Sequence, residues 1–104
     1  MLVFVSGPYT IGDVAANVRN AMEAASQLID KGHLVFVPHL FHFLHMHKPQ
    51  PYVIWTAHDN AFLQHCNALV RLSGVSPGAD DEVILARQWR IPVYSSVKEF
   101  LKEA

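Results

Sequence analysis

Residues 2–9, Leu-Val-Phe-Val-Ser-Gly-Pro-Tyr, decide the fold that this sequence can adopt. An apolar run without alternation, rich in β-branched and aromatic side chains, is typical of a short strand buried on both faces. Gly7-Pro8 ends the strand, because proline has no N–H for a sheet and glycine permits a tight turn. The stretch therefore predicts a parallel strand beneath helices, with a turn at its carboxyl end.

The remaining sequence repeats this alternation of strand and helix. Asp13 can cap a first helix, whose apolar residues recur at spacings of three and four until Lys31-Gly32. Three further strands are expected at 34–37, 68–72 and 91–94, and three further helices from about 52, 79 and 96 onward. Residues 38–51, with four His and three Pro, are expected to be irregular.

The order βαβαβαβα predicts a single α/β domain over residues 1–104. Right-handed crossovers would make it a small doubly wound sheet of the flavodoxin or Rossmann type, with four parallel strands in the order 2-1-3-4 and flanking helices. Ligands in such sheets bind outside the carboxyl ends of the strands, where the winding reverses. The turns at 7–10 and 73–78 are expected to meet there and to form a ligand site.

Composition excludes several classes of protein. The net charge is −1 and 16% of residues are charged, without a large basic cluster, which argues against a protein that binds nucleic acid polymers. The single cysteine, Cys66, excludes an intrachain disulfide and fits a reducing compartment. The apolar N-terminal run is too short for a secretory signal or a membrane span. We therefore expect a soluble cytoplasmic protein.

Glu82 is the first candidate for chemistry, because it follows the Ser76-Pro77-Gly78 turn at the start of a predicted helix. Together with Asp80 and Asp81 it could simply complement the positive end of that helix. Alternatively, a carboxylate in a partly dry crevice could act as a nucleophile at the anomeric carbon of a sugar. Residue type alone leaves both interpretations open.

Asp59 is the second candidate, because it lies on the apolar stripe formed by Trp55, Phe62 and Cys66. An ionised carboxylate there needs either a partner or a function. It could pair with a backbone N–H or a nearby histidine. If it reaches the crevice, it could transfer a proton, or hold the sugar hydroxyls or the leaving base.

The histidines within residues 39–47 suggest either a metal site or a ligand-lining loop. The spacing of His39, His42, His45 and His47 matches no regular metal-binding motif. We therefore favour a loop in which His and Phe side chains, among them His39 and His42, line the pocket and stack on a planar ligand. Metal and cofactor are not expected, and a metal-dependent hydrolase that uses this loop remains the least favoured alternative.

These motifs together resemble the nucleoside 2-deoxyribosyltransferase family, including its small nucleotide N-hydrolase branch. The resemblance rests on Gly7-Pro8-Tyr9, on Asp59 with Phe62-Leu63, and on the pattern Ser76-x-Gly78-x-x-x-Glu82. It implies that Glu82 is the nucleophile and that Asp59 positions the sugar and assists the leaving base. Ser76 and Gly78 would then hold the 5′ end of the nucleotide, and sites would be built at the contacts of a homodimer or larger oligomer.

The turn itself is expected to add substrate-binding and catalytic groups. Gly7 and Pro8 would form one wall of the pocket, and Tyr9 would supply a hydroxyl. The chain departs from the hydrolase branch in having no Arg between Gly7 and Arg19, and Phe4 in place of a strand tyrosine. Transfer to a second base and hydrolysis therefore both remain open.

The sequence thus predicts an enzyme that cleaves or transfers the N-glycosidic bond of a nucleoside or nucleoside 5′-monophosphate. The reaction would pass through a covalent glycosyl-Glu82 intermediate. An alternative of another class is a non-catalytic nucleotide-binding or sensing domain with the same fold.

Overall fold

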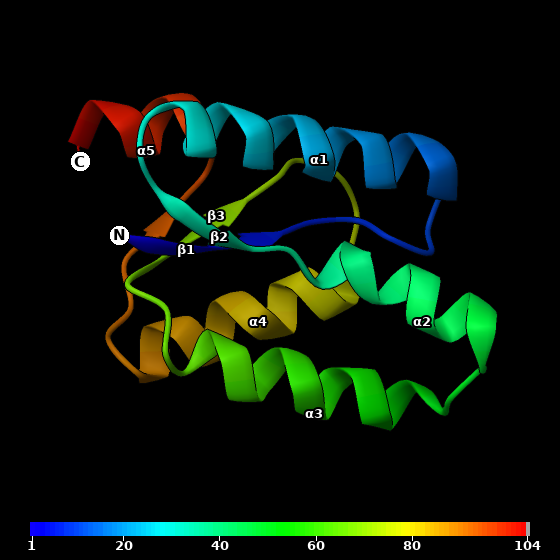
Figure 1. The fold of residues 1–104 in the computed structure, drawn as a ribbon. Helices are drawn as coiled ribbons and strands as arrows, with labels where there is room; N and C mark the ends of the chain where they lie inside the picture. Colours follow the sequence, from blue (N-terminus) through cyan, green and yellow to red (C-terminus); the bar gives the residue numbers. More distant parts are fainter. Residues whose placement is uncertain (104) are drawn as a thin grey trace.

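Four parallel strands form the centre of the structure, a computed structural model that describes residues 1–103 (Figure 1). The strands are β1 (Leu2–Ser6), β2 (Leu34–Phe36), β3 (Ala68–Arg71) and β4 (Val93–Tyr94). They lie in the order β2-β1-β3-β4, and every neighbouring pair is parallel. The predicted doubly wound α/β sheet is therefore confirmed.

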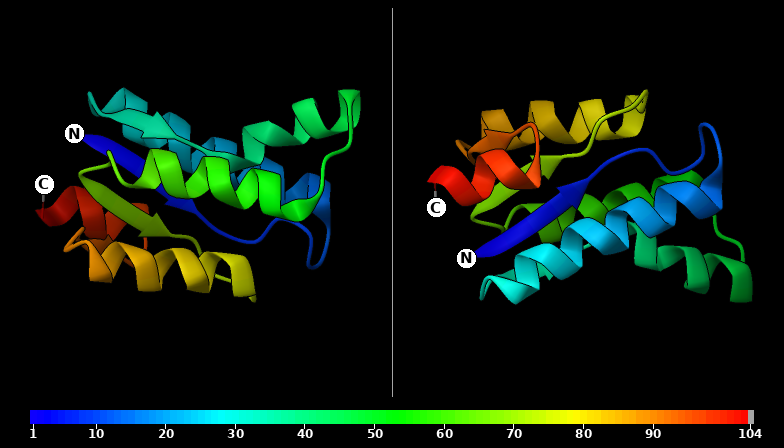
Figure 2. Two further views of the ribbon diagram at one scale, coloured as in Figure 1. Left: turned by 90° about the horizontal axis from the view of Figure 1, so that it is seen from below. Right: turned by 90° about the horizontal axis from the view of Figure 1, so that it is seen from above.

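Helices cover both faces of this sheet, as Figures 1 and 2 show. One face carries α1 (Val14–Asp30) and α5 (Val97–Glu103). The other face carries α3 (Tyr52–Leu63) and α4 (Pro77–Gln88). The arrangement follows from burying apolar strand residues on both sides.

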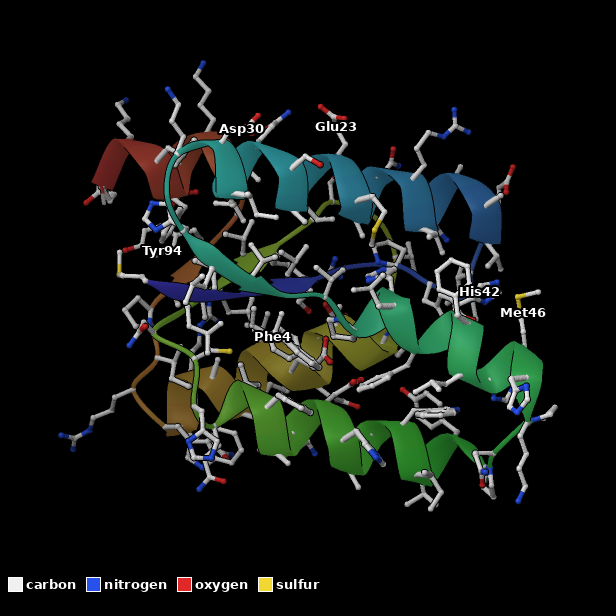
Figure 3. The ribbon with its side chains drawn as sticks, viewed as in Figure 1. Phe4, Glu23, Asp30, His42, Met46 and Tyr94 are labelled. Atoms are coloured by element: carbon white, nitrogen blue, oxygen red, sulfur yellow. The ribbon has the colours of Figure 1, made fainter. Side chains whose placement is uncertain are left out.

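Successive side chains of β1 point to opposite faces of the sheet and therefore belong to two different cores. Val3 and Val5 pack with Leu28 and Phe100 beneath α1 and α5. Phe4, labelled in Figure 3, faces the opposite way and packs with Leu63 and other residues beneath α3 and α4. Val3, Phe4, Val5, Leu28, Leu63 and Phe100 are all fully buried. Residues 3–6 of the segment that decides the fold are thus fully buried.

Residues 38–51 differ from the expected irregular loop. A short 3-10 turn, η1 (Pro38–Leu40), leads directly into the helix α2 (Phe41–His47). None of the residues of α2 is buried, and no side chain caps its start, so the usual sequence signals of a helix are missing. The helix ends before Pro49, because the residue preceding a proline, Lys48, adopts an extended conformation.

Side chains cap the starts of two of these helices, and the cap at Asp13 is as predicted. Asp13 accepts a hydrogen bond from the N–H of Ala16 at 3.1 Å. Ser96 accepts one from the N–H of Glu99 at 3.0 Å. Such caps satisfy donors that have no partner within the helix.

The helices of residues 1–103 include none that is both long and apolar enough to cross a membrane.

Candidate active site

A cavity of about 300 Å³ lies at the carboxyl ends of β1 and β3. Four parts of the chain line it: the turn after β1, the segment from η1 through α2, the helix α3, and the start of α4. This is the predicted position, where the winding of the sheet reverses. Its lining includes both candidate carboxyl groups, Asp59 and Glu82.

Glu82 reaches this cavity from α4. The helix begins at Pro77 rather than at the expected Ala79, so Glu82 lies in its second turn. The hydroxyl of Ser6, at the buried end of β1, donates a hydrogen bond of 2.7 Å to Oε1 of Glu82. Burial raises the pKa of Glu82 to about 7, although the Ser6 hydrogen bond and the charge of Arg71 act in the lowering direction.

Asp59 reaches the cavity from α3 and contacts Glu82 through a side-chain hydrogen bond. Burial raises the pKa of Asp59 to about 8, and the neighbouring charge of Glu82 adds to this increase. Its Oδ1 atom is buried and has no hydrogen-bond partner among residues 1–103. Two carboxyls in contact cannot easily both ionise, so the pair retains one proton near neutral pH.

The other acidic residues of α4 are placed differently. Asp80 forms an ion pair with Arg71 at 3.0 Å and lies at the exposed start of the helix. Asp81 is exposed. The interpretation as a helix-end charge therefore fits Asp80, whereas Glu82 faces Ser6 and Asp59 in the cavity.

Tyr9 also lines the cavity. Its hydroxyl is hydrogen-bonded to Nδ1 of His42, and burial raises the pKa of Tyr9. The turn that carries Tyr9 is held by Asn17, whose amide donates to the carbonyls of Tyr9 and Ile11 at 3.0 and 2.9 Å. The ring of Tyr9 also meets the His39 ring edge-on.

Gly7 and Pro8 have separate places in this turn. Gly7 lines the cavity, and a Cβ atom there would lie 2.9 Å from Cβ of Leu72, so a larger residue would collide with the Leu72 side chain just after β3. Pro8 lines a second cavity, of about 240 Å³, rather than the one with the carboxyls. The Pro8 carbonyl instead accepts a hydrogen bond of 2.8 Å from Nε2 of His39.

Ser76 and Gly78 lie at the start of α4, as predicted, but few donors remain free there. The Ser76 hydroxyl accepts from the N–H of Ala79, and the Ser76 carbonyl accepts from that of Asp80. Pro77 has no N–H, which leaves that of Gly78 as the donor these bonds do not use. Among residues 1–103, no Lys or Arg lines the cavity.

The histidines of residues 39–47 bind to different groups. His39 bonds to Pro8, His42 to Tyr9, and His45 to Trp55. His47 is exposed. Within residues 1–103, no three His, Cys, Asp or Glu side chains come together as metal ligands. The structure thus places His39 and His42 in the cavity wall.

Several residues of the site were not identified from the sequence. The sequence pattern predicts Ser6 only as the last residue of a strand, although a polar residue at the end of a buried strand is a usable signal. Other additions to the cavity wall are His45 and three side chains of residues 50–55, namely Gln50, Tyr52 and Trp55. Their participation depends on how α2 and α3 pack, which the sequence pattern does not reveal.

Comparison with known proteins gives two findings. A family model described as a domain of unknown function, DUF7768, matches residues 1–96. A solved structure of a 2-deoxyribosyltransferase from the psychrotolerant bacterium Bacillus psychrosaccharolyticus is similar, with a TM-score of 0.62. The identity is 16%, over 89% of this chain and 69% of that one, so the likeness shows the α/β fold alone. No curated protein matches the sequence significantly.

Proposed function

We propose that this chain, which belongs to the DUF7768 family, cleaves or transfers the N-glycosidic bond of a nucleoside or nucleoside 5′-monophosphate. The observation that carries this proposal is the contact between Asp59 and Glu82 in a cavity at the switch point of the sheet. The similar fold of a 2-deoxyribosyltransferase supports it.

The two carboxyls would divide the work according to their surroundings. The Ser6 hydroxyl donates a hydrogen bond to Glu82, and the charge of Arg71 favours its ionised form, whereas Oδ1 of Asp59 has no partner among residues 1–103, so the shared proton is assigned to Asp59 and Glu82 is ionised. The Glu82 carboxylate attacks the anomeric carbon, C1′, as the C1′–N bond breaks through an oxocarbenium-like transition state. The bonding electrons pass to the base, which takes the proton from Asp59.

The second step releases the sugar from Glu82. Water or a second base attacks C1′, the C1′–O bond to Glu82 breaks, and the carboxylate is restored. Asp59 takes up the proton that the attacking group loses. The Ser6 hydroxyl holds Glu82 in place through both steps by its 2.7 Å hydrogen bond. The chain supplies nucleophile and acid, so this mechanism uses no metal or cofactor.

The aromatic wall would hold the base. Phe41 and Trp55 stack on one another at a ring-centroid distance of 5.4 Å, and both line the cavity. Trp55 lies one helical turn before Asp59 on α3, so a base beside Asp59 meets aromatic surface. Tyr9 and His42, which also line the cavity, would contact the sugar.

We also propose that the chain works as a homodimer or larger homo-oligomer. Large apolar side chains are more than two-thirds exposed on α3 at Tyr52 and Val53, and nearly so on α2 at Met46. Figure 3 shows Met46 at the end of α2, directed away from the molecule. Exposed apolar surface next to the cavity supports an interface there.

The direct test is to incubate the protein with deoxynucleosides and their 5′-monophosphates and to measure the free base by chromatography. We expect base release by the wild type and a loss of about 10³-fold or more in Glu82→Gln, because removal of a nucleophile abolishes the covalent route. Adding a second base distinguishes transfer from hydrolysis. Glu23→Gln, on the outer face of α1 in Figure 3, is the matched control and should retain full activity.

Nucleotide binding without base release from any substrate, equal in wild type and Glu82→Gln, would refute the enzymatic proposal. That result would instead favour the non-catalytic nucleotide-binding alternative.

A further inference from the structure

The side chain of His45 is fixed in one tautomer by two donors. Its Nδ1 atom accepts a hydrogen bond of 2.9 Å from the indole N–H of Trp55 and one of 3.2 Å from the backbone N–H of Gln50. Indole and backbone N–H groups can only donate, so Nδ1 must carry a lone pair. The ring proton of His45 is therefore on Nε2.

This Nε2–H group is available to a ligand. His45 is partly buried and lines the cavity with Phe41 and Trp55, and its ring meets the Trp55 ring edge-on. Among residues 1–103, no atom accepts a hydrogen bond from Nε2. His45 therefore offers the cavity one N–H donor, and it cannot exchange donor for acceptor without breaking both bonds at Nδ1.

The position of His45 determines which part of a substrate can reach it. His45 is bound to Trp55, one turn before Asp59 along α3. In the proposed reaction Asp59 lies beside the glycosidic bond, and the base extends from there over Trp55. The edge of the base remote from the sugar then approaches His45.

We propose that His45 selects bases with a carbonyl oxygen on this remote edge, by donating its Nε2–H to that oxygen. The proposal rests on the proposed function, which places the base between Asp59 and His45. Hypoxanthine, guanine, uracil and thymine carry such an oxygen. Adenine and cytosine carry an amino group, which would set N–H against N–H and leave both donors unpaired.

The test measures the binding of free bases by calorimetry, because binding requires no turnover. Hypoxanthine and adenine form one pair, and uracil and cytosine a second; within each pair the change at the remote edge is from oxygen to an amino group. We expect wild-type protein to bind the oxo base of at least one pair about tenfold more tightly than its amino counterpart.

Three variants separate recognition from packing. His45→Phe should bring the ratio of the two dissociation constants within that pair close to one. His45→Gln should restore part of it, because its amide oxygen can accept from Trp55 while its NH₂ donates to the base. His47→Phe, an exposed histidine on the same helix, should leave the ratio unchanged.

The proposal is wrong if the preference for the oxo base persists in His45→Phe, if wild-type protein binds amino bases equally well, or if it binds none of the four. These outcomes are separate from failure of the proposed function. Discrimination at His45 without base release from nucleosides would refute only the enzymatic proposal. Base release without any preference for oxo bases would refute only the role of His45.

Discussion

Asp59 carries a raised pKa because its carboxyl group is partly buried and faces Glu82. A carboxyl group whose pKa is higher in the folded protein than in the unfolded chain favours folding when it is protonated. Its contribution is complete below the unfolded pKa of about 4. That contribution decreases as the pH rises through the folded value of about 8.

We therefore predict that wild-type protein loses free energy of unfolding between about pH 4 and pH 8, and that Asp59→Asn loses less. At pH 8 the variant should be more stable than the wild type by roughly 1–3 kcal/mol, because asparagine carries no buried charge. Urea denaturation at several pH values measures this. Asp81→Asn, at an exposed position, should follow the wild type, and an identical slope for Asp59→Asn would contradict the prediction.

At the residue scale, the sequence pattern identifies site residues whose polarity conflicts with their predicted surroundings. It does not identify site residues without such a conflict. Asp59 was identified because a charged residue interrupts an apolar stripe. Glu82 was identified from its place after a Ser-Pro-Gly turn. Ser6 and His45 were not identified as site residues, because their significance depends on hydrogen bonds to Glu82 and Trp55 formed by tertiary packing.

At the element scale, the turn after β1 packs closely against the turn after β3. Gly74 has a φ angle of +116°, and a Cβ atom there would lie 2.7 Å from Cγ of Pro8. Both the backbone conformation and the contact therefore require glycine. The contact fixes the distance between the two turns that border the cavity.

We predict that Gly74→Ala lowers the free energy of unfolding by about 1–3 kcal/mol, from backbone strain together with the collision with Pro8. Gly12→Ala is the matched control, because Gly12 also has a positive φ angle, +88°, but a Cβ atom there would meet open space. Backbone strain alone should lower the free energy of unfolding of Gly12→Ala by about 1 kcal/mol. Chemical denaturation of both variants measures the difference, and equal losses would show that the Pro8 contact is unimportant.

The elements themselves could be predicted wherever burial imposed a pattern. All four strands and the order of the sheet follow from short apolar runs separated by helical periodicity. The helix α2 was missed because it buries none of its residues, and so its apolar side chains show no single stripe. β4 is shorter than expected, with two paired residues, because Pro92 cannot donate to the neighbouring strand.

At the scale of the whole molecule, the two helical faces differ in exposed apolar surface. On α3, Tyr52 and Val53 are 71% and 68% exposed. Figure 3 shows Glu23 and Asp30, on the outer face of α1, directed away from the molecule. An interface between copies of the chain is therefore expected on the side of α2 and α3.

We predict that analytical ultracentrifugation detects a dimer or larger oligomer at micromolar concentrations. Val53→Lys should raise the dissociation constant of this oligomer at least tenfold, because an unpaired charge would enter the interface. Ile29→Lys, at a position 55% exposed on α1, should have no effect. A monomeric wild type, or equal dissociation by both variants, would contradict the prediction.

The helix α2, which has no buried residue, has a further consequence for the energetics of the cavity. It is held to the rest of the protein mainly by side chains at its inner edge, such as those of His42 and His45. Such a segment opens at a lower free-energy cost than the global unfolding of the sheet. Amide protons of α2 should therefore exchange with solvent by local opening while both cores stay intact, and hydrogen exchange would measure this.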